Sequence, residues 1–355
     1  MPGYQRFATP RAYVDTISTH IALGTYTTSN ITIKDDAGST VVLEEGNKED
    51  LFDMKPHNYV VIPKETQQFY IELNTGFGTD LLQGQNFIAF LGHNLHSANA
   101  VFKIEVSDSS DFSSGNTTIN AALASHTINA AADSSADYFD PATNGWTLIA
   151  YPKQTGVGNR YLRITVTDDD SVNDNFSVDI AIGAICYGEY IDWPHAMDIN
   201  LTTAYDYDGT TLHNAVGGST YASSTHYGAP VWHSTQPWSL TNTDNENYHY
   251  AGRRGRMRHS MNFSHMADTN LFAQNQADYY DFYLGLNSDG SAEDNLHSQF
   301  YNKVIGQHNP FMWTMDKTST NEADYGIYRL ADNSFEAKQI GSRVWNVNMD
   351  LIESW

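Results

Sequence analysis

The chain has 355 residues, of which 42 are Asp or Glu and 19 are Lys or Arg, so its formal net charge is −23 at pH 7. This acidity argues against a nucleic-acid partner, because the phosphates would be repelled at long range. Hydrophobic residues make up 40% of the chain, enough for sizeable cores, and a single cysteine, Cys186, excludes an intrachain disulfide.

No apolar stretch approaches the roughly 20 residues needed to cross a bilayer, and the first residues lack the apolar core of a signal peptide. We therefore expect no membrane insertion and a chain that is made and folded in a reducing cytoplasm. The apolar neighbours of Cys186 predict that it is a small buried residue of a strand.

The first 65 residues are predicted to be a β segment. The sequence Asp-Asp-Ala-Gly-Ser at residues 35–39 predicts a turn between two strands, and Pro56 and Pro63 limit the strand between them to a few residues. The other predicted strands of this segment are residues 12–15, 31–34 and 40–43.

Residues 66–192 form the clearest predicted unit. Residues 107–145 are polar and show no helical apolar stripe. Short strands separated by turn-rich loops predict a β-sandwich. The predicted strands are residues 69–73, 86–92, 100–107, 146–151, 160–167 and 176–188.

Residues 193–355 are predicted to form a C-terminal β domain with helices near 268–306, after a linker at 191–195. Asp268 is a predicted helix N-cap, and residues 295–305 predict a second helix. Two strands show clear alternation. Their apolar faces are Met257, His259, Met261 and Phe263 in the first, and Trp345, Val347, Met349 and Leu351 in the last. The overall class is all-β.

Motifs for catalysis are missing from the sequence. It has no nucleophile elbow, no phosphate-binding loop and no His-Glu-x-x-His motif. We therefore expect no catalytic residue and no cofactor. Paired carboxylates for sugar hydrolysis need only spatial proximity, so a polysaccharide-degrading enzyme stays a third possibility without a specific signal.

The histidines and the acidic loops are the candidate metal ligands of the sequence. His93 and His96 fall in a predicted turn with no third ligand near in sequence, so we interpret them as polar turn residues. The acidic clusters are residues 168–170 with Asp174, and Asp206 with Asp208. Both could bind calcium, but the second lacks the glutamate that completes an EF-hand loop. Carboxylates in loops are normally solvated, so we predict no metal.

A basic cluster and an aromatic cluster are the candidate binding residues. In a strand, Arg254, Arg256 and Arg258 share one face, which favours pairing with acidic neighbours across a subunit interface. Tyr221, Trp232 and Trp238 are candidates for stacking on sugar rings, although aromatic side chains pack equally well in a core or an interface.

Residues 86–189 resemble a galactose-binding-like (discoidin-type) β-sandwich as found in phage tail proteins. The similarity lies in the apolar strand that ends in Gly92-His-Asn-Leu, in the strand at 101–106 that leads into Ser-Asp-Ser-Ser-Asp-Phe, and in Arg160-Tyr-Leu-Arg-Ile-Thr and Val178-Asp-Ile-Ala-Ile-Gly. Such sandwiches often bind carbohydrate through loops, but no ligand residue can be assigned by motif.

The C-terminal part resembles tail-tip or minor tail proteins of phages. The matching motifs, in order, are Tyr207-Asp-Gly, Gly217-Gly, the strand at 254–263, His308-Asn-Pro-Phe-Met-Trp, Tyr325-Gly-Ile-Tyr-Arg-Leu and the final strand at 344–355.

The two resemblances imply a structural protein of the virion tail, at the tail tip or baseplate, that forms a symmetric oligomer. Its partners would be copies of itself and other virion tail proteins. The alternative is a carbohydrate-binding adhesin that recognises a host surface glycan.

Overall fold

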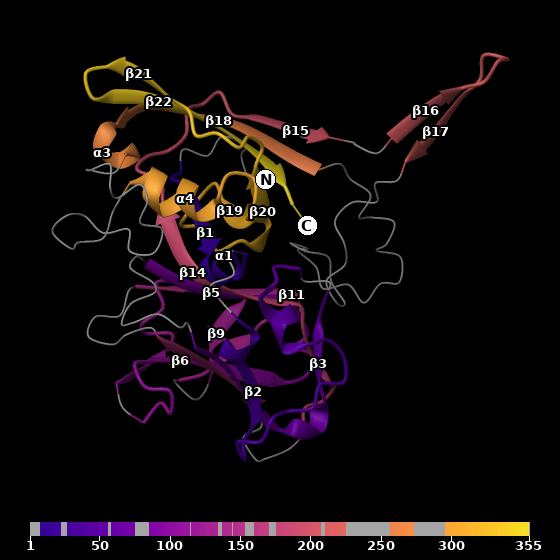
Figure 1. Ribbon diagram of the computed structural model, residues 1–355, viewed down its shortest axis with the longest axis vertical. Coiled ribbons are helices and arrows are strands. Elements are labelled where there is room, and N and C mark those ends of the chain that lie inside the picture. Colours follow the sequence, from indigo (N-terminus) through magenta and orange to yellow (C-terminus); the bar gives the residue numbers. More distant parts are fainter. Residues whose placement is uncertain are drawn as a thin grey trace.

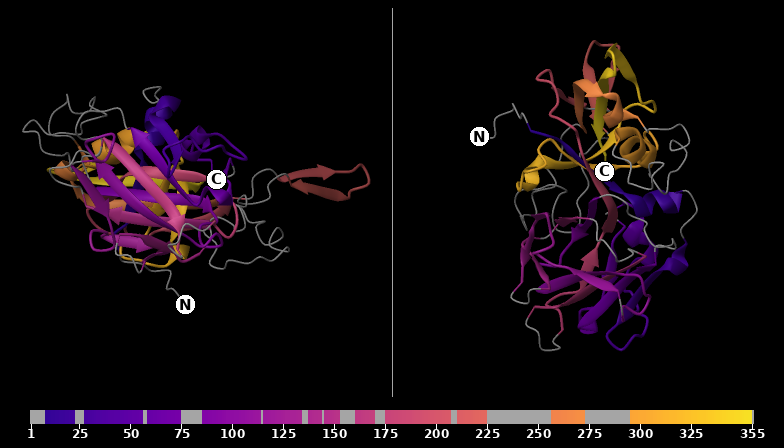
Figure 2. Two further views of the ribbon diagram at one scale, coloured as in Figure 1. Left: turned by 90° about the horizontal axis from the view of Figure 1, so that it is seen from below. Right: turned by 90° about the vertical axis from the view of Figure 1, so that its left-hand side faces the viewer.

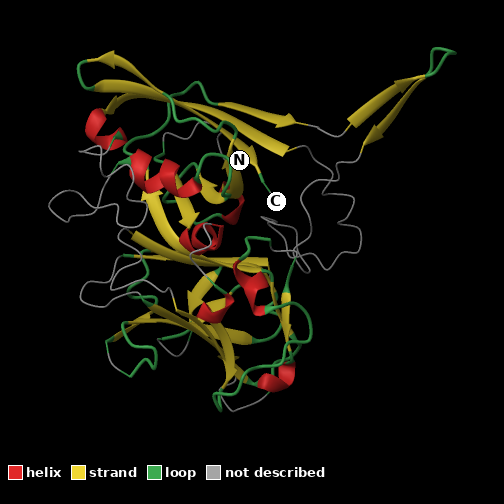
Figure 3. Cartoon of the chain, viewed as in Figure 1, coloured by secondary structure: helices red, strands yellow, loops and turns green. Residues whose placement is uncertain are grey.

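The structure is a computed structural model. It describes residues 8–22, 27–55, 58–74, 85–113, 115–133, 137–143, 145–152, 160–169, 175–206, 210–224, 256–272 and 295–354. These residues are mainly antiparallel β-strand with a few short helices, which confirms the all-β class (Figure 3). In the described ranges, no helix is both long and apolar enough to cross a membrane.

One large sheet runs through the molecule and has eleven strands in the described residues. Its spatial order is β15 (Thr202–Asp206), β18 (Arg256–Ala267), β22 (Val344–Glu353), β20 (Tyr325–Leu330), β19 (Phe311–Thr314), β1 (Arg11–Asp15), β14 (Ala184–Asp192), β5 (Gln85–His93), β11 (Gly145–Tyr151) and β8 (His126–Ile128), and β21 (Ala337–Gly341) pairs with β22. In Figure 1 the sheet begins with β15, β18 and β22 at the top and continues through β14 to β5 and β11.

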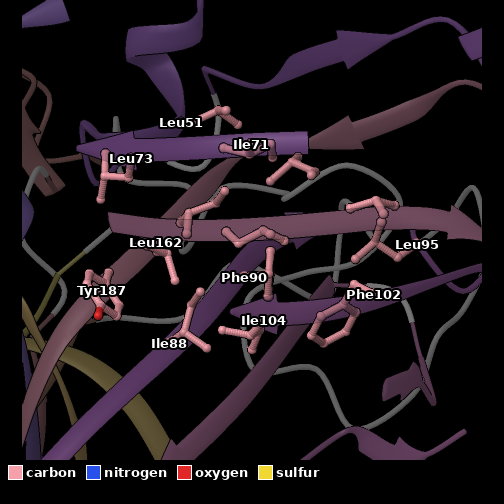
Figure 4. Packing of buried hydrophobic residues seen from close by; sticks show 14 of the residues in the cluster. Leu51, Ile71, Leu73, Ile88, Phe90, Leu95, Phe102, Ile104, Leu162 and Tyr187 are labelled. Carbon is pink, nitrogen blue, oxygen red and sulfur yellow. The ribbon is translucent and has the colours of Figure 1, made fainter. Parts of the chain in front are cut away.

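A second sheet faces the β14, β5 and β11 end of the large sheet and has seven strands. They are β2 (Ile31–Asp35), β4 (Gln68–Asn74), β12 (Tyr161–Asp168), β6 (Ala100–Ser107), β10 (Phe139–Pro141) and β9 (Ala130–Ala132), with β7 (Asn116–Ile119) paired to β6. Between the sheets lies one apolar layer, in which Ile88 and Phe90 of the large sheet meet Ile104 and Leu162 of the second (Figure 4). The predicted β-sandwich is therefore confirmed.

The polar stretch at 107–145 contains four short strands, β7 to β10, that the sequence did not predict. Their buried apolar side chains are few, chiefly Ile119, Ile128 and Phe139. A single apolar residue gives no period, so only pairing with longer strands reveals these elements.

The N-terminal strand β1 lies in the middle of the large sheet, between β14 and β19. All five of its residues are buried. The approach to β14 is close, because a side chain at Gly188 would collide with the carbonyl oxygen of Val14. Strands from 1–65, 66–192 and 193–355 thus share one sheet, and their division into three separately folding units stays a prediction.

The segment after β14 corrects the linker predicted at residues 191–195. β14 itself continues to Asp192, and Trp193 is only 2% exposed. Its indole packs edge-on against Phe300 and Trp313, with ring centroids 5.0 and 4.6 Å apart. The segment belongs to a core because Trp193 contributes a large apolar surface.

Trp193, Phe300 and Trp313 belong to a second hydrophobic core, separate from the core of the sandwich. Short helices cover this second core. A π-helical turn, η5 (His297–Tyr301), continues into α4 (Asn302–Val304), which confirms the second predicted helix. The helix predicted from Asp268 is α3 (Asp268–Leu271); Phe272 is extended, and residues 273–294 lie outside the described residues. The other helices are α1 (Thr16–Ala22), η1 (Thr28–Asn30), η2 (Lys48–Phe52), η3 (Lys64–Thr66) and η6 (Glu322–Asp324).

The predicted alternation of the last strand is confirmed. In β22 the side chains of Val347, Met349 and Leu351 are buried, and those between them are exposed or half-buried. Trp345 is half-buried and packs against Phe272, with ring centroids 5.0 Å apart. Trp355 lies outside the described residues.

Two small two-stranded sheets complete the fold. β13 (Ile180–Ile182) pairs with β3 (Val60–Ile62) beside the sandwich core. β16 (Thr210–Asn214) pairs with β17 (Thr220–Ser224) as a hairpin that stands away from the rest of the molecule (Figures 1 and 2).

Candidate functional site

The histidine pair of the sandwich has structural hydrogen bonds. His93 is buried, its Nε2 lies 2.9 Å from the Thr147 hydroxyl, and the Leu95 amide donates to its Nδ1. His96 donates through Nδ1 to the Pro141 carbonyl at 3.0 Å. Among the described residues, no three His, Cys, Asp or Glu side chains are grouped as for a metal ion. Asp170, Asp174 and Asp208 lie outside those residues.

Buried titratable groups meet where β1 and α1 contact β14. Asp15 accepts hydrogen bonds from the amides of Ile17 and Tyr187, at 3.0 and 3.3 Å, and burial raises its pKa to about 6. Nearby, Lys303 donates to Glu189 and to the Gln299 side chain. These groups are inside the protein, so we assign them to the stability of the fold. Cys186 is also buried, as predicted.

The predicted arginine cluster is only partly described. Arg254 lies outside the described residues, whereas Arg256 and Arg258 begin β18. Arg258 is partly exposed and forms an ion pair with Asp350 of β22, with 3.0 Å between Nη2 and Oδ2. A pairing with an acidic neighbour is thus present within one chain, and a role of these arginines at a subunit interface stays a prediction.

A third arginine, Arg329, joins this cluster through strand register. Ile352 of β22 pairs with Arg258 on one side and with Arg329 of β20 on the other, and directly paired residues point to the same face. Arg329 donates from Nε to the Ser354 hydroxyl at 3.0 Å and from Nη1 to the Gln307 carbonyl at 3.0 Å. Burial and the charge of Arg256 lower its pKa.

These arginines border an open cavity of about 390 Å³. Its lining comes from three neighbouring strands and the segments beside them: Arg258, Gln307, Arg329, Leu330, Ala331, Asp332 and Ile352. The sequence did not indicate Arg329, because it stands alone in an apolar strand. Only the order β18, β22, β20 brings it beside Arg258.

Three residues separate the end of β15 from the start of the hairpin β16–β17. Five residue pairs join its strands, from Thr210 with Ser224 to Asn214 with Thr220. The tip is closed by a hydrogen bond from the Gly218 amide to the Ala215 carbonyl at 2.9 Å. Gly218 has φ +85°, a left-handed conformation that favours glycine. The Thr residues and the Gly-Gly tip therefore account for the hairpin.

Solvent surrounds the hairpin. Every residue from 210 to 223 is exposed, including apolar Leu212 at 64% and Tyr221 at 63%, and Val216 at the tip is fully exposed. Of the aromatic candidates for ligand binding, Tyr221 is thus placed on the hairpin, while Trp232 and Trp238 lie outside the described residues.

The hairpin also lies in a charge-free part of the sequence. Residues 209–243 contain no Asp, Glu, Lys or Arg, although 17% of the whole chain is charged. At the root of the hairpin, Asp206 is the last residue of β15 and lies opposite Arg256 of β18 in the strand register. The hairpin therefore leaves the body beside Arg256, at the β15 edge of the large sheet (Figure 1).

No family model matches the sequence, and no curated protein matches it. Among solved structures, the chain has a slight similarity to the adhesin domain of Epf from Streptococcus pyogenes. The TM-score is 0.21 and the identity 8%, over 73% of this chain and 87% of that chain. A similarity of this size supports no conclusion about fold or function.

Proposed function

We propose that this chain is a non-catalytic structural component of a virus particle, located at the tail tip or baseplate of a bacteriophage. In this proposal it forms a symmetric oligomer with copies of itself and contacts other virion tail proteins. The resemblance to phage tail proteins supplies the location. The observation that carries the assembly role is the exposed hairpin β16–β17.

The exposed hairpin gains little stability from packing on its own chain. A two-stranded hairpin that packs on nothing is at best marginally stable in water, because it buries too little apolar surface. β16 and β17 expose Leu212, Tyr221 and Val216 instead of burying them in their own chain. A β-hairpin of this kind is suited to contact with another molecule, as expected of a building block.

The arginine cluster gives a second reason to place an interface at this end of the large sheet. Arginine is enriched at protein interfaces, where its planar guanidinium pairs with carboxylates. In a chain of charge −23, the two guanidinium groups of Arg258 and Arg329 line one cavity beside Asp332 and form its basic part. Acidic neighbours in an assembly could pair with it.

Two measurements test this proposal. The purified chain is examined by sedimentation velocity over a range of concentrations, and gold-labelled antibodies against it are applied to purified phage particles for electron microscopy. We expect a closed oligomer, of about three or six copies, and gold at the tail tip. A chain that stays monomeric, with no gold on the tails, would contradict the proposal.

The carbohydrate-binding adhesin is the second candidate, and it is favoured by the exposed ring of Tyr221 on a projecting element. Aromatic rings in such positions can stack on sugars. A glycan array compares the chain with its Tyr221→Ala variant. Binding that the substitution abolishes would favour the adhesin, and release of reducing sugars from host polysaccharide would instead favour an enzyme.

A further inference from the structure

We propose that the hairpin β16–β17 is an assembly arm that packs on a second copy of this chain and extends the large sheet of that copy at its outer strand β15. The inference rests on the proposed assembly function and specifies its contact.

The arm has backbone groups that can form further hydrogen bonds. Each of its strands pairs with the other along one edge, so the outer edge of each strand carries backbone N–H and C=O groups directed to solvent. Its exposed side chains, Leu212 and Tyr221 among them, provide apolar surface to bury. Addition of such a strand to an open sheet edge is a common mode of recognition.

β15 is an open edge of matching length. It pairs with β18 on one side, from Thr202 with Ser260 to Asp206 with Arg256, and no strand of the described residues lies along its other side. β15 and β16 each have five residues. Ile199, just before β15, is 81% exposed, and Tyr205 within it is 49% exposed, so apolar surface adjoins the free edge.

The other open edges are less suitable. β8, at the far end of the large sheet, has three residues. β21 carries Lys338 and an irregular register between Gln339 and Gly341, two features that protect an edge from pairing. The outer side of β2 is occupied by the following segment, since the Val41 amide donates to the Ile33 carbonyl.

Charge favours a copy of this chain as the partner. Two copies of charge −23 repel each other, so contact is least costly where neither surface is charged. Residues 209–243 are free of formal charge, and β15 contains one charged residue, Asp206. A partner of different chemistry would be selected by complementary charges, which the arm lacks.

The position of the arm also favours exchange between copies. Three residues separate β15 from β16, so the arm and the acceptor edge adjoin in each chain. The hydrogen bonds that an arm could form with its own β15 are equally available on the β15 of a copy. The arm points away from its own body (Figure 2), and arm-to-edge contacts repeated from copy to copy form a ring when the rotation between neighbouring copies closes.

The contact is tested first by cross-linking. Thr202→Cys on β15 and Thr211→Cys on β16 are made in separate chains carrying different tags, which are mixed and treated with a short bismaleimide. The natural Cys186 is buried and should not react in the folded chain. We expect cross-linked pairs between a Thr202→Cys copy and a Thr211→Cys copy, identified by mass spectrometry.

The second test is a charge placed on the arm. Leu212→Asp should weaken self-association at least about tenfold in Kd, because the carboxylate would be buried without a partner. Val42→Asp is the control, since Val42 is 82% exposed on the body of the protein. It should change Kd less than about twofold. Circular dichroism checks that both variants keep the native fold.

Each outcome decides the inference. Oligomers that Leu212→Asp weakens, together with mixed cross-links, support the arm on a second copy. Oligomers that survive Leu212→Asp and give no mixed cross-links overturn the inference but leave the assembly function. A wild-type chain that is monomeric at every concentration overturns both the inference and the proposed assembly function. A chain with both cysteines that cross-links internally at every dilution shows that the arm folds onto its own β15, which also overturns the inference.

Discussion

Two antiparallel strand pairs in the C-terminal part of the molecule have opposite environments. β18 and β22 pair side by side in the large sheet and bury Met261, Phe263 and Met349 in the second core. β16 and β17 pair in the same way, yet they expose Leu212 and Tyr221. Strand pairing is the same in both; only one pair has a core to pack on.

This difference shows that backbone pairing alone does not stabilise a β-structure. Apolar burial provides most of the favourable free energy, about 25 cal/mol per Å² of apolar surface removed from water. β18 and β22 obtain this burial from their own chain. We infer that β16 and β17 obtain it from a second copy.

The largest effect is expected from truncating one ring in each pair. Phe263→Ala should lower the free energy of unfolding by about 3–5 kcal/mol, because it leaves a cavity in a packed core. Tyr221→Ala, its matched control on the arm, should change it by less than about 0.5 kcal/mol in dilute monomer. Urea unfolding measures both. Equal losses would show that the arm packs on its own body.

The pH dependence of the anchored region gives a second test at Asp15, where β1 ends. Burial raises the pKa of Asp15 from 3.8 to about 6, so the folded state favours the protonated carboxyl. The protonated Asp15 carboxyl makes its full contribution to the free energy of unfolding below pH 3.8. This contribution is lost as the pH rises through 6. Relative to Asp15→Asn, the wild type should lose about 2 kcal/mol between pH 4 and 6.

Asparagine keeps an oxygen that can accept the amides of Ile17 and Tyr187, so Asp15→Asn removes the titration and retains the helix start. Urea unfolding of both proteins at several pH values gives the difference. If wild type and variant run parallel from pH 4 to 6, Asp15 has an ordinary pKa and this part of the core is more hydrated than the structure shows.

The smallest effect is expected at the arginine cluster. The ion pair of Arg258 with Asp350 is partly exposed, so Arg258→Gln should cost less than about 1 kcal/mol of stability. If the cluster belongs to an interface, the same variant should weaken self-association more than it weakens folding. Unchanged association by sedimentation would remove Arg258 from the interface.

The sequence was sufficient where one strand carries its own pattern. Phe69, Ile71 and Leu73 alternate in β4, as do Val347, Met349 and Leu351 in β22, and both strands were predicted. Features that depend on distant partners were not accessible. Nothing local indicates that β1 lies between β14 and β19, or that Trp193, followed by a proline, is buried.

The same limit applies to the candidate site. The arginines of β18 were identified from their spacing, but Arg329 joins them only through the pairing of both with Ile352. The sequence analysis predicts no hairpin at residues 210–224, because a hairpin exposed on both faces has no apolar period to detect. The position of Tyr221 therefore came from the structure alone.

Hydrogen exchange at two protein concentrations tests the central contrast most directly. The amides of β18 and β22 should be protected at both concentrations, since their own chain covers them. The amides of residues 210–224 should be protected only at the high concentration, where arms contact neighbouring copies, and should exchange freely in dilute monomer. Exchange of the arm that is independent of concentration would contradict the account.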